Sequence, residues 1–484
     1  MEIISKEFIR PSSPTPFEKK DHKLSLLDQF SSHYFIPFLF FYPKQSPHSK
    51  DVNFDDPSKT TLYLKQSLSE SLTKFYPLAG KLNPNRRAVS CDDSGVLFVE
   101  AKFDASLSQA VQAGPCESFS QYLPFEPVIG GRDDKLLPSH PKEQIVFAVQ
   151  ITWFRCGGNA IGVCMSHKVA DFSSLVMFLD SWSALNRGET VGSVPNFDLG
   201  RKIFPPLDRD VGLPNLVRLE EDRKVGLKRI VFGKEKLLEL KKLATSSHSP
   251  ASSPVVNDPT RVEVVTAFLW KHFINVERAK NQGGCAKQIM FNMWHAVNLR
   301  SRMSKLAASS ISCNGGGGDD DDDSINDRGE FPFGNFAIST KASFISNEND
   351  EAGAKDFGDL VRLTSDAFKI VNEDFVLNCA VPLLKTLDDN RITEILWPPT
   401  MMMSHSMFTS WCRFPLYEMD FGWGKPTAVG VAGQQNRNVV FLMDTNDGEG
   451  IEAWMAIPED DELTLLPDDL LSDSPPIDLF SSAS

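Results

Sequence analysis

The chain has 484 residues, of which 41% are hydrophobic and 24% charged, and its formal net charge is −14. This length exceeds that of one ordinary core, so we expect a globular protein with two domains of similar size. The negative charge argues against broad binding to nucleic acid or anionic membranes, which favour basic surfaces. The longest aromatic-rich apolar run, Phe35–Tyr42, has eight residues, whereas a helix needs about 20 to cross a bilayer.

The N-terminus and the cysteines both favour a cytosolic protein. Residues 1–7 lack the basic lead and the apolar core of a secretory signal, so we expect a cytosolic location. The eight cysteines are scattered, without CxxC or a related metal-binding spacing. This pattern predicts reduced thiols, with neither disulfides nor a zinc site.

The clearest local structure in the first half lies between residues 144 and 187. Residues 144–154 are rich in β-branched and aromatic side chains, Gly157-Gly158-Asn159 is a turn signal, and 160–165 is a second apolar run, which together predict a β-hairpin. From Phe172 to Arg187 apolar positions recur at helical spacing. His167 is therefore predicted to lie between a strand and a helix.

A stretch interrupted by prolines, at 189–225, separates the two halves and predicts a crossover between domains. Beyond it, 234–245 and 262–280 have helical patterns and 288–297 has a strand pattern, so the second half is also α/β. The expected division is a first domain at 1–190, a linker at 191–225 and a second domain at 226–484, with a segment near 385–412 packing on the first domain.

The low-complexity stretch NGGGGDDDDD at 314–323 is predicted to be a disordered loop, because its glycines do not pack and its carboxylates repel one another. No GK[ST] follows the glycines, which excludes a phosphate loop. The glycine and closing glutamate of an EF-hand are misplaced as well, so no metal is expected.

The charge balance reverses between Thr260 and Lys305, where eight basic residues accompany two acidic ones. Such a cluster offers a binding region for a polyanionic ligand. It is equally the composition of a solvated helical face. Both interpretations remain open from the sequence.

The most informative motif is HKVAD at 167–171, which follows the predicted hairpin. A histidine at the end of a buried strand is held rigidly, and its reference pKa of about 6.5 leaves it neutral enough near pH 7 to accept a proton. Asp171 immediately precedes a helical pattern, where Asp is a preferred N-cap, and it can pair with a base such as Arg300. We therefore predict a general base at His167 and a structural carboxylate at Asp171.

Other reaction classes lack their motifs. The chain has no GxSxG nucleophile elbow, and the DFG sequence that begins at Asp420 is accompanied neither by HRD nor by a glycine-rich loop, so serine hydrolases and kinases are disfavoured. Without an activated nucleophile, the economical mechanism is direct attack of a bound alcohol on a thioester, with His167 as the base.

These residues resemble a known family, the plant BAHD acyltransferases. HKVAD at 167–171 pairs with DFGWG at 420–424, and the resemblance runs nearly end to end. Supporting stretches, in family order, are FYPLAGKL at 75–82, NLRSRM at 298–303, Gly334-Asn335 and Thr409-Ser410-Trp411. The segments 11–16 and 196–199 look like the branch whose members mostly acetylate alkaloids and other specialised metabolites. The resemblance implies two chloramphenicol-acetyltransferase-like α/β domains with mixed sheets and an active-site channel between them.

The resemblance also implies roles for single residues. The matching histidine deprotonates the acceptor, and the aspartate matching Asp171 is structural. Asp420 belongs to a motif that is sometimes labelled catalytic, but we expect it to be architectural. Thr409 and Trp411 match positions that can bond the tetrahedral oxyanion. Four residues are expected to contact coenzyme A, through phosphate or the pantetheine arm: Thr260, Arg261, Gly334 and Asn335.

The sequence thus predicts an acetyl-CoA-dependent O-acyltransferase that acetylates a small hydrophobic alcohol, an alkaloid or terpenoid. Acetyl-CoA is a co-substrate, no cofactor is bound permanently, and we expect a monomer that binds neither nucleic acid nor membrane. One alternative is a catalytically silent binding protein of the same fold, and another is an acyltransferase that uses a longer or aromatic acyl-CoA. Condensation, as in peptide synthetases, is disfavoured because Ser166 precedes His167 where those proteins have a second histidine.

Overall fold

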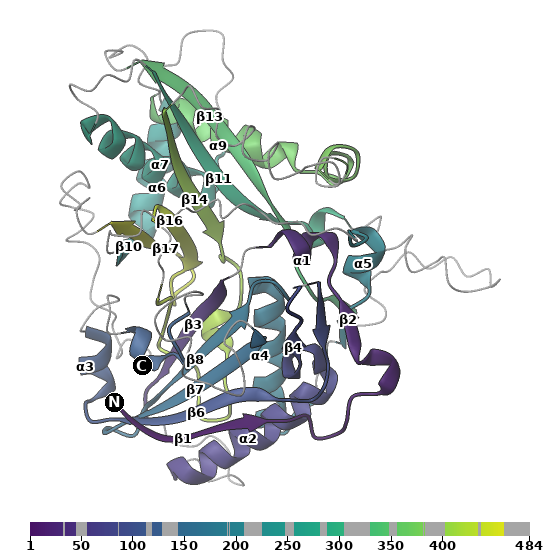
Figure 1. Cartoon of the computed structure of the whole chain (residues 1–484). Helices are drawn as coiled ribbons and strands as arrows, with labels where there is room; N and C mark the ends of the chain where they lie inside the picture. The colour runs from purple at the N-terminus through teal and green to yellow at the C-terminus, as the bar shows by residue number, and fades with distance from the viewer. Residues whose placement is uncertain are drawn as a thin grey trace.

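The computed structural model describes sixteen parts of the chain: 1–31, 34–44, 56–85, 87–112, 119–127, 144–190, 192, 194–207, 225–246, 256–280, 288–303, 330–347, 356–380, 382, 402–433 and 437–458. These residues form two domains, each built on a mixed sheet of six strands (Figure 1). The glycine–aspartate loop at 314–323 and most of the predicted crossover lie outside the described residues. None of the described helices is both long and apolar enough to cross a bilayer.

The first sheet has the strand order β1-β6-β7-β8-β3-β15. Its strands are β1 Glu2–Ile9, β6 Val96–Phe103, β7 Phe147–Phe154, β8 Asn159–Ser166, β3 Phe35–Tyr42 and β15 Ala428–Gly430. Strands β7 and β8 form the predicted antiparallel hairpin. All residues of β3, β7 and β8 are buried, which explains their continuous apolar runs. Helices α2, Pro57–Lys74, and α4, Phe172–Asn186, pack against each other beside this sheet.

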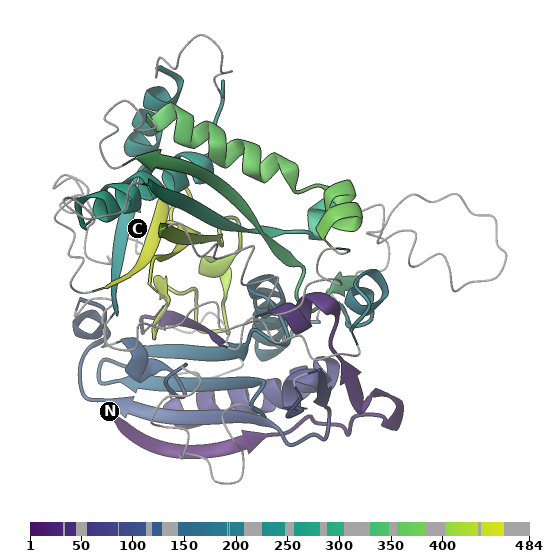
Figure 2. The same ribbon diagram turned by 45° about the horizontal axis from the view of Figure 1, so that its top comes forward.

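The second sheet has the order β10-β17-β16-β14-β11-β13. Its strands are β10 Val225–Phe232, β17 Ile451–Pro458, β16 Val439–Asp444, β14 Met402–Ser410, β11 Gln288–Asn298 and β13 Ala337–Asn347. Three helices cover one face of it: α6 Lys234–Ser246, α7 Arg261–Lys280 and α9 Phe357–Ile370. Figure 2 shows α9 lying along the outer side of this sheet.

Shorter elements surround the two sheets. The strands are β2 Asp21–Lys23, β4 Lys81–Leu82, β5 Ala88–Ser90, β9 Val194–Asn196 and β12 Glu330–Pro332, and the helices are α1 Leu26–Phe30, α3 Leu107–Gln112, α5 Leu199–Ile203 and α10 Glu373–Phe375. Parallel pairing of β9, which lies in the expected linker, with β12 joins this part of the chain to the second domain. This pairing brings the loop after β12 next to the strand-to-helix connection at His167.

Two segments of the second domain contact the first: the end of the expected segment near 385–412, where Trp411 packs on Phe172 and Phe38, and strand β15. Strand β15, Ala428–Gly430, pairs with β3 at the edge of the first sheet. The described part of the expected segment near 385–412 consists mainly of β14, which lies inside the second sheet between β11 and β16. Alternating apolar residues fit either sheet, so only the tertiary pairing distinguishes the two strands.

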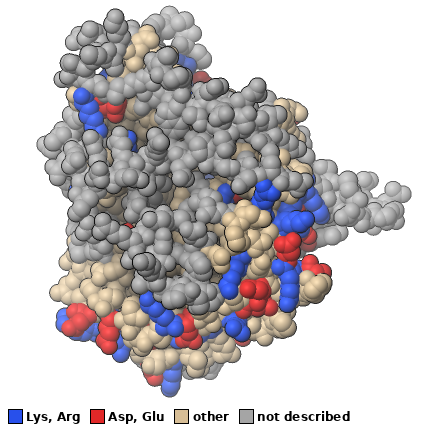
Figure 3. All heavy atoms as spheres, in the orientation of Figure 1, with Lys and Arg blue, Asp and Glu red and all other residues tan. Residues whose placement is uncertain are grey.

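Charged residues are mixed on the described surface. Figure 3 shows Lys and Arg interspersed with Asp and Glu over the first domain. Within the predicted basic stretch, Arg300 pairs with buried Asp171 and Arg302 donates to the carbonyl of Phe368. These two arginines therefore stabilise the fold, and the stretch does not act as one exposed cationic patch.

Candidate active site

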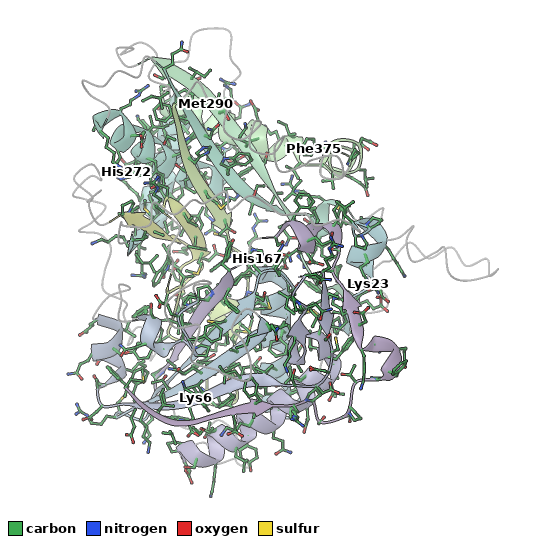
Figure 4. All side chains as sticks on the ribbon, in the orientation of Figure 1. Lys6, Lys23, His167, His272, Met290 and Phe375 are labelled. Atoms are coloured by element: carbon green, nitrogen blue, oxygen red, sulfur yellow. The ribbon has the colours of Figure 1, made fainter. Side chains whose placement is uncertain are left out.

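His167 follows β8 directly and lies where the two domains meet (Figure 4). Its backbone N–H donates to the carbonyl of Tyr34 at 3.0 Å, and the two rings make an edge contact with centroids 5.2 Å apart. Its Nδ1 lies 3.0 Å from Oδ1 of Asn335, which belongs to the loop between β12 and β13. The imidazole of one domain is therefore oriented by an amide of the other.

The bonds of Asn335 fix which nitrogen of His167 carries the proton. Nδ2 of Asn335 donates to Oδ1 of Asp28 at 2.8 Å and to the carbonyl of His167 at 2.9 Å. Both partners are acceptors, so the amide nitrogen must face them and Oδ1 must face the imidazole. Nδ1 therefore carries the hydrogen and Nε2 the lone pair. No hydrogen bond to Nε2 is found among the described residues, so this nitrogen remains available to a substrate.

Asp28 anchors this arrangement and was missed by the sequence analysis. Its carboxylate accepts from the backbone N–H and hydroxyl of Ser25, at 2.8 and 2.7 Å, and from the backbone and side-chain nitrogens of Asn335, both at 2.8 Å. Burial raises the pKa of Asp28 to about 6, although these bonds favour ionisation. The only local signal was the pattern Ser25-x-x-Asp28, which marks the start of α1.

The electrostatics keep His167 neutral. Burial lowers the pKa of His167, and Asp171 and Asn335 offset this only in part. A lowered pKa favours the uncharged ring near pH 7. Together with the proton on Nδ1, this gives a base that is ready to accept a proton at Nε2.

Asp171 stabilises the loop that holds His167. It caps α4 by accepting from the backbone N–H of Ser174 at 3.0 Å, and it pairs with Arg300 through two bonds of 2.8 and 3.0 Å. A fourth bond comes from the backbone N–H of Phe336 at 2.9 Å. Burial alone would raise the pKa of Asp171, but Arg300 and these donors outweigh it and lower the pKa. None of these bonds goes to the imidazole, so the carboxylate fixes the position of the loop without contacting the ring.

Asp420 closes its own loop. Its Oδ1 accepts from the backbone N–H groups of Gly422 and Gly424 at 2.7 and 2.8 Å, and both glycines have positive φ, which other residues rarely adopt. Its carbonyl accepts from Arg187, at the C-terminal end of α4. Since α4 has 15 residues and begins beside Asp171, the two ends lie about 22 Å apart. DFGWG therefore docks the second domain on the first.

The motif around Trp411 reaches the His167 loop from the second domain. The Trp411 ring stacks on Phe172, the first residue of α4, with centroids 3.7 Å apart and an interplanar angle of 7°. Thr409 lies two residues earlier in β14, and no hydrogen bond to its hydroxyl is found in the described parts of the chain. A role for Thr409 and Trp411 in bonding an oxyanion remains a prediction.

The residues expected to contact coenzyme A fall into two places. Thr260 and Glu263 form a reciprocal cap at the start of α7, and Arg261 binds Asp444 and the carbonyls of Gly448 and Glu449. A phosphate contact by Arg261 remains a prediction and would compete with these bonds.

Gly334 and Asn335 instead lie against the His167 loop. Gly334 has φ +132°, and its carbonyl accepts from Ser174 and Arg300. Contact of this pair with the pantetheine arm remains a prediction. The structure also shows that Asn335 orients the imidazole of His167.

Replacing Asn335 by Ala should lower kcat by up to about 10²-fold, because the imidazole loses the partner that fixes its tautomer and orientation. The bond to Asn335 also raises the pKa of His167. The acid limb of the kcat/KM profile should therefore move to lower pH in the variant, which initial rates over a pH series would measure. A loss of kcat with an unmoved limb would contradict the positioning role.

Comparisons with known proteins agree with this architecture. A family model described as the Transferase family matches residues 1–314 and 330–465. The chain is 40% identical to vinorine synthase of Rauvolfia serpentina, over 98% of this chain and 97% of that protein, and 39% identical to stemmadenine O-acetyltransferase of Catharanthus roseus, with the same coverage. The crystal structure of vinorine synthase matches with a TM-score of 0.73 and 38% identity, over 99% of this chain and 100% of that one.

A more distant structure supports the fold alone. TRI101 of F. sporotrichioides, solved with coenzyme A and T-2, matches with a TM-score of 0.61 at 16% identity, over 91% of this chain and 95% of that one. The predicted fold of two chloramphenicol-acetyltransferase-like domains is thus confirmed. The chain belongs to the BAHD acyltransferase family, in the branch that contains vinorine synthase, and is an acyl-CoA-dependent O-acyltransferase.

Proposed function

We propose that the protein transfers an acetyl group from acetyl-CoA to a hydroxyl of a specialised metabolite, an alkaloid or terpenoid alcohol. The observation that carries this mechanism is the lone pair on Nε2 of His167, fixed through Asn335 and left without a partner among the described residues. Nε2 takes the hydroxyl proton while the alcohol oxygen attacks the thioester carbonyl. Collapse of the tetrahedral intermediate breaks the C–S bond, and the imidazolium returns the proton to the thiolate of coenzyme A.

The finer features of the proposal draw on several residues. We assign oxyanion stabilisation to Thr409 and Trp411, because β14 brings this segment against the His167 loop. We also propose that four residues contact coenzyme A: Thr260, Arg261, Gly334 and Asn335. Two relatives that are named O-acetyltransferases support acetyl as the acyl group and a plant metabolite as the acceptor: stemmadenine O-acetyltransferase and, at 31% identity, salutaridinol 7-O-acetyltransferase of Papaver somniferum. We also propose that the enzyme is a cytosolic monomer.

The test is ester formation with acetyl-CoA, hexanoyl-CoA and benzoyl-CoA against a panel of alkaloid and terpenoid alcohols. Mass spectrometry of the ester is preferable to a thiol reagent, because exposed Cys156 would add a background. We expect a product only when an alcohol is present, and fastest with acetyl-CoA. Preference for a longer or aromatic donor would overturn the acetyl assignment, and absence of any ester would favour a silent binding protein.

A further inference from the structure

In one half of the second sheet, the described helices α6, α7 and α9 pack on one face only. On β11, β13 and β14, side chains alternate between the helix-packed face, where Phe408 and Met293 are fully buried, and an opposite face, where 43% of Met407 is exposed. We call this opposite face the open face, and define it by Thr409, Ala296, Ser339, Met407, Trp294 and Lys341. Figure 1 shows these three strands rising from the junction of the two domains.

The strand register places the open face directly beside the proposed reaction centre. Ala296 pairs with Thr409 on one side and Ser339 on the other, so three small side chains form one row. Two residues further along, Trp294 pairs with Met407 and Lys341, which form a row of long side chains. The two rows are about 7 Å apart. We call the row of small side chains (Thr409, Ala296 and Ser339) the floor, and the row of long side chains (Met407, Trp294 and Lys341) the ledge. The floor therefore forms a shallow depression with the ledge along one side.

The ledge is held in place by contacts around Trp294. Its Nε1 donates to Nδ1 of His405 at 3.3 Å, and the ammonium of Lys341 lies 5.3 Å from its ring centroid. Burial, with a smaller effect from Lys341, lowers the pKa of His405 and keeps that imidazole a neutral acceptor. The indole is thus fixed as a flat apolar wall.

The charge of the open face favours uncharged ligands over cations. Strands β11, β13 and β14 contain no Asp or Glu in their described residues, and Lys341 is their one Lys or Arg. A protonated amine would meet this ammonium without a compensating carboxylate on these strands. An uncharged ring system, by contrast, gains apolar contact with Met407 and Trp294 and leaves Lys341 solvated.

We propose that the open face binds the apolar ring skeleton of the acceptor alcohol in uncharged form, and that amine-bearing acceptors bind there as the free base. The inference rests on the proposed function, since it assumes that the acceptor hydroxyl reacts between His167 and Thr409. Ala296 and Trp294 are then specificity-determining residues, and Lys341 disfavours cationic acceptors.

Binding is tested without turnover, using N-phenyl-1-naphthylamine as an uncharged, apolar fluorescent probe and two bicyclic alcohols as competitors. Borneol is neutral, whereas tropine carries an amine that is protonated at pH 7. We expect borneol to displace the probe far better than tropine. Ala296→Trp, which fills the floor, should weaken probe binding by about tenfold. Lys341→Glu, at an exposed site, should reverse the preference in favour of tropine.

Leu238→Ala is the matched control, because this leucine is 50% exposed but lies on α6, on the helix-covered side of the sheet. It should leave probe binding unchanged. For any alcohol that is acetylated, Ala296→Trp should raise the acceptor KM about tenfold while the KM for acetyl-CoA stays constant. Equal binding of the probe to wild type and Ala296→Trp would overturn the inference. Absence of ester formation would instead count against the proposed function, which the probe titration does not depend on.

Discussion

Replacing His167 by Ala should lower kcat for acetyl transfer by about 10²- to 10⁴-fold, the usual contribution of a positioned general base. The two described polar partners of the loop cannot replace the base, because Asp171 and Asn335 are already bonded to Arg300, to Asp28 and to backbone groups. Binding of acetyl-CoA should change little. Initial rates at saturating acetyl-CoA, with the KM of both substrates, provide the measurement.

Two controls separate a lost base from a damaged fold. His22 is also buried, and its pKa is lowered to about 4, mainly by burial, but it lies on β2 outside the Asn335 network. His22→Phe should keep kcat within a few-fold of wild type. Added imidazole should partly restore His167→Ala, because a free ring can occupy the vacated space. Wild-type kcat in His167→Ala would exclude the proposed base.

The wild-type enzyme should also show a characteristic pH dependence. Protonation of Nε2 removes the lone pair, so kcat/KM should fall on the acid side with one titrating group. Because burial lowers the pKa of His167 below its ordinary 6.5, the fall should begin below that pH. An acid limb of the kcat/KM profile with its midpoint well above pH 7 would show that another group controls the reaction.

Replacing Asp171 by Ala should reduce the free energy of unfolding by about 3–5 kcal/mol, the range for breaking a buried ion pair. The variant leaves the guanidinium of Arg300 buried without its partner and removes the cap of α4 and the acceptor for Phe336. Equilibrium denaturation of wild type, Asp171→Ala, Arg300→Met and the double variant would measure it. The double variant should be less destabilised than the sum of the single variants.

The pH dependence of this stabilisation has a defined sign. The folded-state pKa of Asp171 lies below its ordinary 3.8. Its contribution is therefore present above that value and is lost as the pH falls through the folded-state pKa. The difference in stability between wild type and Asp171→Ala should shrink in strong acid. If the losses of stability in Asp171→Ala and Arg300→Met at pH 7 added up to the loss in the double variant, the two residues would not be a coupled pair.

Elements with a strong local pattern were predicted from the sequence. The hairpin before His167, helix α4 and helix α7 have continuous or periodic apolar residues, and their observed limits differ from the expected ones by only a few residues. The cap at Asp171 was also foreseen, because capping depends on neighbouring backbone groups. The paired motifs HKVAD and DFGWG were enough to predict the family.

By itself, the sequence determined the fold family and the local structure around His167, the proposed base, since these depend on contacts between near neighbours or on recognisable motifs. Only the tertiary structure decided the tautomer of His167, because Asp28 and Asn335 are 307 residues apart. It also decided that Ala428–Gly430 joins the first sheet and that the described helices pack on only one face of β11. Long-range pairing of this kind depends on packing across the whole chain, which no local pattern encodes.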